Sequence, residues 1–203
     1  MSEGAAHELR DRIVDAAWHV MSERGLAATR TSAIAETAGC AEGSIYRYFD
    51  DKPQLLLAAI RSHLPDAEAV EARLLELAGT RTVRANLLDV AHAACALYGD
   101  LVPLAAAVLA DATLAERRRE AFGGQDFRPS HLAGAVAGYL SVEQRLGRVR
   151  ATADPGLAAR LLVNGCVGES LIDGLFESDR SRGSGLGELV SLVLRDLEPE
   201  GAA

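Results

Sequence analysis

The stretch from residue 42 to residue 52 gathers side chains that suit contact with a nucleic acid. Arginine pairs with guanine or phosphate, serine and tyrosine hydroxyls donate to phosphate oxygens, and glycine permits close approach of the backbone. The residues of these types are Gly43, Ser44, Tyr46, Arg47 and Tyr48, followed by Lys52, the single lysine of the chain. A second interpretation has both tyrosines packing in the core of a small domain. Residue chemistry alone leaves the two interpretations open.

The spacing of apolar residues predicts two short helices that position these side chains. The first runs from about Thr31 to Ala38, with Thr29 or Thr31 as its N-cap, and it ends in a tight turn at Gly39. The second runs from about residue 42 to residue 49. Two short helices joined by a turn that contains glycine form a helix-turn-helix.

The second of these helices is expected to have one buried and one exposed face. Ile45 and Phe49 lie four residues apart and define the buried side, because residues at this spacing share a helix face. Gly43, Ser44 and Arg47 project from the opposite side. The two tyrosines lie on the flanks, each with its hydroxyl at the rim.

Longer helices are predicted on either side of this pair. An amphipathic pattern runs from His7 to Arg24 and stops at Gly25. After the pair, Asp51 is a suitable N-cap, proline is tolerated in the first turn that follows, and helical periodicity continues to Leu64.

The segment from Thr29 to Leu55 resembles the DNA-binding domain of TetR-family transcriptional repressors. It follows a helix that ends in Glu-Arg-Gly, and the matching residues are Thr31, Ile34, Ala35, Ala38, Gly39, Gly43, Tyr46, Tyr48, Phe49, Lys52 and Leu55. The resemblance implies that the helix at 42–48 is the recognition helix. It also implies that DNA, mostly phosphate, is met by Thr31, Ser44, Tyr46, Arg47, Tyr48 and Lys52.

Two residues depart from the pattern of that family. Ala41 stands where a Ser or Thr would cap the recognition helix, and losing such a cap costs about 0.5–2 kcal/mol. Glu42 stands where a basic or polar residue is common. Its carboxylate suits the helix dipole and could accept from cytosine N4, but a phosphate would repel it. Glu42 therefore either contributes specificity or points away from the duplex.

The rest of the chain is predicted to be helical, which makes the protein all-α. We expect a three-helix helix-turn-helix DNA-binding domain at 1–50, a linking helix at 51–64, and a larger ligand-binding and dimerisation domain at 65–203. Within the larger domain, one helix is expected over 83–98 and a new helix near Pro103. The resemblance implies a homodimer formed through the last two helices. Glycines within 164–174 fit close approach of two helices, either across that interface or within one subunit.

The resemblance also implies an effector pocket in the larger domain. Its candidate lining residues are polar side chains on otherwise apolar stripes: His92, Cys95, Tyr98, His131, Tyr139, Asn164 and Glu169. Each of them also has an ordinary interpretation as a hydrogen-bonded core or surface residue. A mostly apolar pocket with a few polar groups favours a small lipophilic molecule, which the sequence does not identify.

Composition limits the other possibilities. The net charge is −8, and residues 1–64 carry seven basic and nine acidic side chains, so DNA contact must use locally placed cations. The three cysteines form no metal-binding pattern, and neither a metal nor a cofactor is expected. The chain lacks GxSxG, HExxH, P-loop and GxGxxG motifs, so no catalytic residue is assigned. With neither a signal peptide nor a membrane span expected, the predicted location is the cytoplasm.

These observations favour a transcriptional repressor that binds double-stranded DNA at a palindromic operator and is released by a small-molecule effector. The alternative keeps the DNA-binding role but makes a thiol the sensor, through Cys40, Cys95 or Cys166.

Overall fold

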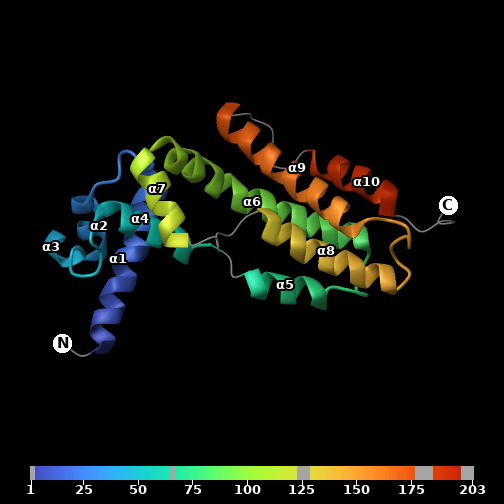
Figure 1. Cartoon of the computed structure of the whole chain (residues 1–203), viewed down its shortest axis with the longest axis horizontal. Helices are drawn as coiled ribbons and strands as arrows, with labels where there is room; N and C mark the ends of the chain where they lie inside the picture. Colours follow the sequence, from blue (N-terminus) through green and yellow to red (C-terminus); the bar gives the residue numbers. More distant parts are fainter. Residues whose placement is uncertain (1–2, 65–66, 123–128, 177–184, 198–203) are drawn as a thin grey trace. The chain divides into compact units, whose positions relative to one another are not determined.

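The computed structural model describes residues 3–64, 67–122, 129–176 and 185–197. These residues form α-helices and contain no strand, which confirms the all-α fold class (Figure 1). The helices are α1 (Glu3–Arg24), α2 (Thr31–Ala38), α3 (Glu42–Ile45), α4 (Lys52–Ser62), α5 (Ala67–Glu76), α6 (Val83–Ala110), α7 (Ala112–Phe122), α8 (Pro129–Arg145), α9 (Pro155–Phe176) and α10 (Leu186–Leu197).

The chain divides into two compact units. The first comprises residues 1–64 and 104–126, and the second comprises residues 65–103 and 127–203. The sequence assigned the whole of 65–203 to one domain. Residues 104–126 instead group with the N-terminal helices, because Leu104, Val108 and Leu114 pack in the same core as Ile13 and Leu55. The predicted functional boundaries at 50 and 64 stay predictions.

The first unit is built on local stop and start signals. Gly39 ends α2 with φ of +65°, and the N–H of Cys40 reaches back to the carbonyl of Ala35 at 3.0 Å. The predicted threonine cap of α2 is wrong: Arg30 is the N-cap residue and makes no side-chain capping bond. The Thr29 hydroxyl donates instead to the carbonyl of Gly25 at 2.7 Å.

α3, which the resemblance implies is the recognition helix, is shorter than predicted. It ends at Ile45 rather than at residue 48 or 49, and turns follow it. The N–H of Arg47 bonds the carbonyl of Ser44 at 3.3 Å, and that of Tyr48 bonds Ile45 at 3.0 Å. These bonds span three residues rather than four, so the chain tightens into 3₁₀-type turns at this point.

In the second unit, α9 contacts both α8 and α10 (Figure 1). The Asp-Pro pair at 154–155 predicts a cap followed by proline at the first helical position. Asp154 does cap α9, since its carboxylate accepts from the N–H groups of Gly156 and Leu157 at 2.9 and 3.0 Å. The predicted break before Pro103 is wrong, because α6 continues through that proline. The sequence also predicts loops at 123–129 and, from its Ser, Gly and Arg residues, at 177–187, and both lie largely outside the described residues.

The length and apolar composition of α6 test the expectation that the chain has no membrane span. By length and composition alone this helix is apolar enough to cross a membrane, with a mean hydropathy of 1.8 over its best window. A core helix of a soluble protein passes the same test, and Leu87, Ala91 and Tyr98 of α6 are core residues here. One such helix is therefore weak evidence for a membrane span.

Gly165 of α9 is a point of close contact between α9 and α10. A Cβ atom at this position would lie 2.6 Å from a terminal methyl carbon of Leu189. Gly165 therefore follows the second of the two predicted alternatives, close packing within one subunit. Gly168 and Gly174 have nothing within 4 Å of an added Cβ.

We expect Gly165→Ala to lower the free energy of unfolding relative to a matched glycine replacement elsewhere. Overpacking against Leu189 costs about 1–3 kcal/mol. Gly134→Ala is the control, because Gly134 is exposed inside α8 with nothing within 4 Å of an added Cβ. That change should raise stability by up to about 1 kcal/mol through helix propensity. Urea denaturation followed by circular dichroism measures both, and equal stability of the two variants would contradict the packing assigned to Gly165.

Candidate nucleic-acid interface

The short helix α3 and the turn after it separate into a buried and an exposed side. Ile45 is 1% exposed and Phe49 is 3% exposed, which confirms the predicted buried face. Gly43 and Arg47 are exposed, and Ser44 is half-buried. The structure therefore leaves Gly43 and Arg47 fully accessible to a partner and Ser44 partly accessible.

The two tyrosines differ from each other. Tyr46 is 53% exposed and available to a partner. Tyr48 is half-buried and packs against the core of the first unit, and its hydroxyl is buried without a hydrogen-bond partner among the described residues. The expectation that both hydroxyls lie at the rim is therefore wrong for Tyr48, because the tightened turn directs its ring inward.

Glu42 bonds to a neighbouring helix. The Thr31 hydroxyl, at the first residue of α2, donates to Oε1 of Glu42 at 2.5 Å. Ala41 is the N-cap residue of α3 and makes no side-chain capping bond, as the sequence predicts. The first turn of α3 thus lacks a side-chain acceptor for its free N–H groups, while its carboxylate faces α2.

Asp51 fixes the start of α4, where Lys52 is the first helical residue. One carboxylate oxygen accepts from the N–H of Gln54 at 2.8 Å, so Asp51 is the N-cap that the sequence predicts. The other oxygen pairs with Arg117 of α7 at 2.6 Å. Lys52 itself is half-buried. The ion pair with Arg117 was missed by sequence reasoning, since Arg117 belongs to a run of three arginines that looks like a solvated face.

Two arginines of α1 make contacts within the first unit. Arg12 donates to the carbonyl of Ala38 at 2.9 Å, which satisfies the C-terminal end of α2. The guanidinium of Arg10 lies 5.5 Å from the centre of the Phe49 ring, a cation–π distance. Both contacts tie α1 to the helix-turn-helix.

Comparison with known proteins agrees with this geometry. The family described as "Bacterial regulatory proteins, tetR family" matches residues 13–59. These residues contain α2, α3 and most of α1 and α4. The N-terminal domain belongs to the TetR family.

Relatives and solved structures extend the comparison. The transcriptional repressor KstR2 of Rhodococcus jostii is 32% identical over 102 residues, which cover 46% of this chain and 50% of that protein. The chain thus spans about half the length of this curated relative. A putative TetR-family regulator from Mesorhizobium loti superposes with a TM-score of 0.76 at 19% identity, over 98% of this chain and all of the other. The regulator FadR of Bacillus subtilis, solved in complex with stearoyl-CoA, superposes with a TM-score of 0.61 at 20% identity, over 90% of this chain and 96% of the other.

Outside the TetR-family domain, the candidate effector residues divide into two groups. His92, His131, Asn164 and Glu169 are exposed, and Nδ1 of His92 lies 2.8 Å from the carbonyl of Leu88 on its own helix. The others, Cys95, Tyr98 and Tyr139, are buried in the core of the second unit. Burial raises the pKa of Tyr98 to about 12 and that of Tyr139 to about 12, so both phenols stay protonated at neutral pH. The structure does not bring the seven together, and their ligand role stays a prediction.

The cysteines occupy two different settings. Cys40 is half-buried in the turn between α2 and α3. Cys95 of α6 and Cys166 of α9 are both buried and free, and the Cys95 thiol donates to the carbonyl of Cys166 at 3.6 Å. The proximity of the two thiols lowers the pKa of Cys95 and raises that of Cys166. Among the described residues, no group of three or more His, Cys, Asp or Glu side chains is placed to hold a metal ion.

A groove in the second unit is lined by none of the seven candidate effector residues. It lies among α5, α6 and α8 and has a volume of about 460 Å3. Eight of its eleven lining residues are aliphatic, and the other three are Arg73, Arg81 and Asp89. Sequence reasoning missed this groove because its wall includes the turn between α5 and α6, whose path depends on contacts with α8.

We expect the start of α3 to gain stability from an added hydroxyl at its N-cap. Ala41 has the extended backbone that an N-cap needs, with φ of −71° and ψ of 142°. Ala41→Thr and Ala41→Val are nearly identical in shape, and only the first offers an oxygen to the free N–H groups. The Thr variant should exceed the Val variant by about 1 kcal/mol in free energy of unfolding. Thermal denaturation of the pair measures this, and equal stabilities would mean that these N–H groups already have partners.

Proposed function

We propose that this protein is a cytoplasmic transcriptional repressor. In this proposal it binds a palindromic operator as a homodimer and leaves the DNA when a small lipophilic molecule binds its second unit. The observation that carries the proposal is the exposed side of α3 within a TetR-family domain. There, and in the turn after α3, Gly43 and Arg47 are exposed and Ser44 is half-buried, with Lys52 at the start of the next helix.

The proposed DNA contacts are Thr31, Gly43, Ser44, Tyr46, Arg47, Tyr48 and Lys52. Arg47 and Tyr46 are exposed, and they suit base edges or phosphates directly. Lys52 suits a phosphate, because it lies in the first turn of a helix whose N–H groups also favour anions. Tyr48 supports the surface by packing beneath it, and its buried hydroxyl requires a shift before it can reach DNA. Two of these seven residues, Arg47 and Lys52, are cations. The ionic contribution of one subunit to the free energy of binding is therefore small, and a dimer doubles it.

The exposed apolar face of α9 supports the proposed dimer. Leu157, Leu161 and Ile172 are 46%, 55% and 53% exposed, and their spacing puts them on one side of the helix. Leu192 of α10 is 63% exposed. Contiguous exposed aliphatic side chains are typical of protein–protein contacts. Two copies joined through α9 and α10 would place two recognition helices on the two halves of a palindrome.

A bound molecule is favoured over thiol oxidation as the releasing signal. A regulator of the same fold, the B. subtilis FadR, was solved with stearoyl-CoA, and the long hydrocarbon chain of that molecule supports an effector with an apolar part here. Cys166 is 0% exposed and Cys95 is 8% exposed, so an oxidant reaches this thiol pair only when the core opens.

We expect Arg47→Ala to weaken operator binding by about 1–3 kcal/mol and Lys52→Ala to reduce the salt dependence of binding. A lost phosphate contact lowers the slope of log affinity against log salt by about 0.9 per site. Fluorescence anisotropy with DNA from upstream of the protein's own coding sequence measures both. Arg145→Ala is the control, because it removes one exposed positive charge from α8. Wild-type affinity in the Arg47→Ala, Lys52→Ala double variant would rule out the assigned surface.

We expect Leu161→Glu together with Ile172→Glu to produce a monomer, because two buried charges at a dimer contact lack partners. Light scattering coupled to size-exclusion chromatography measures the mass, and operator affinity should fall with it. Leu146→Glu is the control, since Leu146 is 54% exposed but lies at the end of α8. A double variant that remains dimeric would show that the contact lies elsewhere.

A further inference from the structure

The groove among α5, α6 and α8 has the size and composition of a small-molecule site. Its volume of about 460 Å3 is within the range of about 300–1,000 Å3 typical of ligand pockets. Aliphatic side chains form most of its wall, and they suit a hydrocarbon body. Its charged residues are two arginines and one aspartate, so the groove carries an excess of positive charge.

Arg81 is the residue of this groove whose position is most constrained. Its guanidinium pairs with Asp89 at 2.5 Å, yet 53% of its side chain remains exposed. Its backbone has φ of +38°, the one positive φ of a residue other than glycine in the described part of the chain. This conformation costs free energy, and it persists only where the surrounding structure imposes it.

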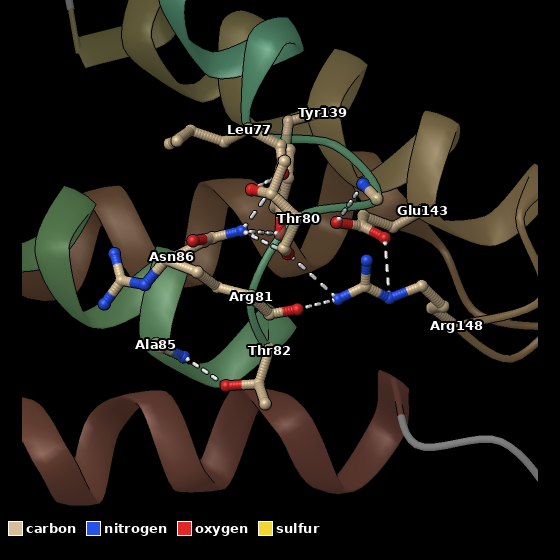
Figure 2. A network of polar contacts seen from close by, with 10 residues as sticks. Leu77, Thr80, Arg81, Thr82, Ala85, Asn86, Tyr139, Glu143 and Arg148 are labelled. Carbon is tan, nitrogen blue, oxygen red and sulfur yellow. Dashed lines mark hydrogen bonds and ion pairs between the residues drawn. The ribbon is translucent and has the colours of Figure 1, made fainter.

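A network of polar contacts imposes that conformation (Figure 2). The Arg148 guanidinium donates to the carbonyl of Thr80 at 3.1 Å and to the carbonyl of Arg81. Glu143 pairs with Nε of Arg148 at 3.3 Å and accepts from the N–H of Gly79 at 3.2 Å. All of these contacts act on the turn between α5 and α6, and Arg81 lies in that turn.

Asn86 holds the same turn from the other side (Figure 2). Its side-chain nitrogen donates to the carbonyls of Leu77 and Thr80, both at 3.3 Å, and it lies 3.1 Å from the hydroxyl of Tyr139. Asn86, Tyr139 and Glu143 are all 0% exposed. A buried carboxylate or amide costs free energy unless it is hydrogen-bonded. Because Asn86 and Glu143 make their hydrogen bonds to the backbone of this turn, they hold the turn in one conformation. Here that conformation is the turn that carries two lining residues of the groove, Leu77 and Arg81.

We propose that this groove binds an amphiphile with an aliphatic body and one carboxylate. The aliphatic body lies on the leucine, valine and alanine side chains, and the carboxylate pairs with Arg81 and Arg73. A planar guanidinium suits such a carboxylate because it offers two parallel N–H donors. Asn86, Glu143 and Arg148 are positioning residues that hold Arg81 at the groove. This inference rests on the proposed function only in naming the amphiphile as the effector.

Isothermal titration of the full-length, DNA-free protein with decanoate and with decanol tests the site, because the two probes differ only in the charged group. We expect decanoate to bind at least tenfold more tightly than decanol. Arg81→Met keeps the aliphatic part of the side chain and should remove this preference without weakening decanol. Arg84→Met is the control, since Arg84 is an exposed arginine of α6 that does not line the groove. Equal binding of the two probes by the wild type, no binding of either, or an undiminished preference in Arg81→Met would overturn the proposal.

Arg148→Lys tests the positioning role separately. It retains the positive charge beside Glu143 but lacks the geometry to reach two carbonyls and a carboxylate together. The preference for decanoate should fall severalfold while decanol still binds, which also shows that the variant is folded. An unchanged preference would overturn the positioning role of Arg148. Loss of decanol binding would also contradict that role, because it would mean that the whole groove needs Arg148.

The same probes separate this inference from the proposed function. If decanoate binds but does not release operator DNA, the groove stands and the effector role fails. If neither probe binds while Arg47→Ala still weakens operator binding, the groove fails and the DNA-binding role stands.

Discussion

The first unit depends on one carboxylate, that of Asp51, which holds the start of α4 from two sides. One oxygen caps the helix at the N–H of Gln54, and the other pairs with Arg117 of α7. The ion pair is partly exposed and contributes little by itself, so the cap supplies most of the stabilisation. Because Lys52 follows directly, the place of the proposed phosphate contact is set by a capped helix start. The surface proposed to face DNA is thus fixed by backbone geometry more than by its own side-chain contacts.

Sequence reasoning succeeded in this unit wherever the signal was local. A glycine at φ of +65° ends α2, and an aspartate before Lys-Pro caps α4, as predicted from residue type. Ile45 and Phe49 are buried at the predicted spacing. The length of α3 and the inward turn of Tyr48 were not predictable, because both depend on how the turn packs against the rest of the unit. A two-turn amphipathic pattern does not distinguish an α-helix from one helical turn followed by 3₁₀ turns.

In the second unit, the sequence predicted the helices but not the polar residues of the interior. Apolar stripes predicted its helices, but they did not identify which polar residues face inward. Asn164 and Glu169 are exposed, whereas Glu143 is fully buried. A signal for Glu143 existed: it continues the stripe of Leu132, Val136 and Tyr139 at spacings of four, three and four, which put it on the buried face. Its partner Arg148 and the backbone of Gly79 come from other segments, so the pairing itself required the fold.

The acidic balance of the N-terminal region constrains how the proposed complex can form. Residues 1–64 carry two more acidic than basic groups, and Glu42 lies beside the surface assigned to DNA. The Thr31 hydroxyl donates to Glu42, so in the proposed complex a phosphate must replace this carboxylate as the acceptor. That exchange is unfavourable near a polyanion unless Glu42 gains a donor of its own, such as a cytosine amino group. In the proposed complex, the contact between Thr31 and a phosphate therefore depends on whether the base pair beside Glu42 supplies that donor.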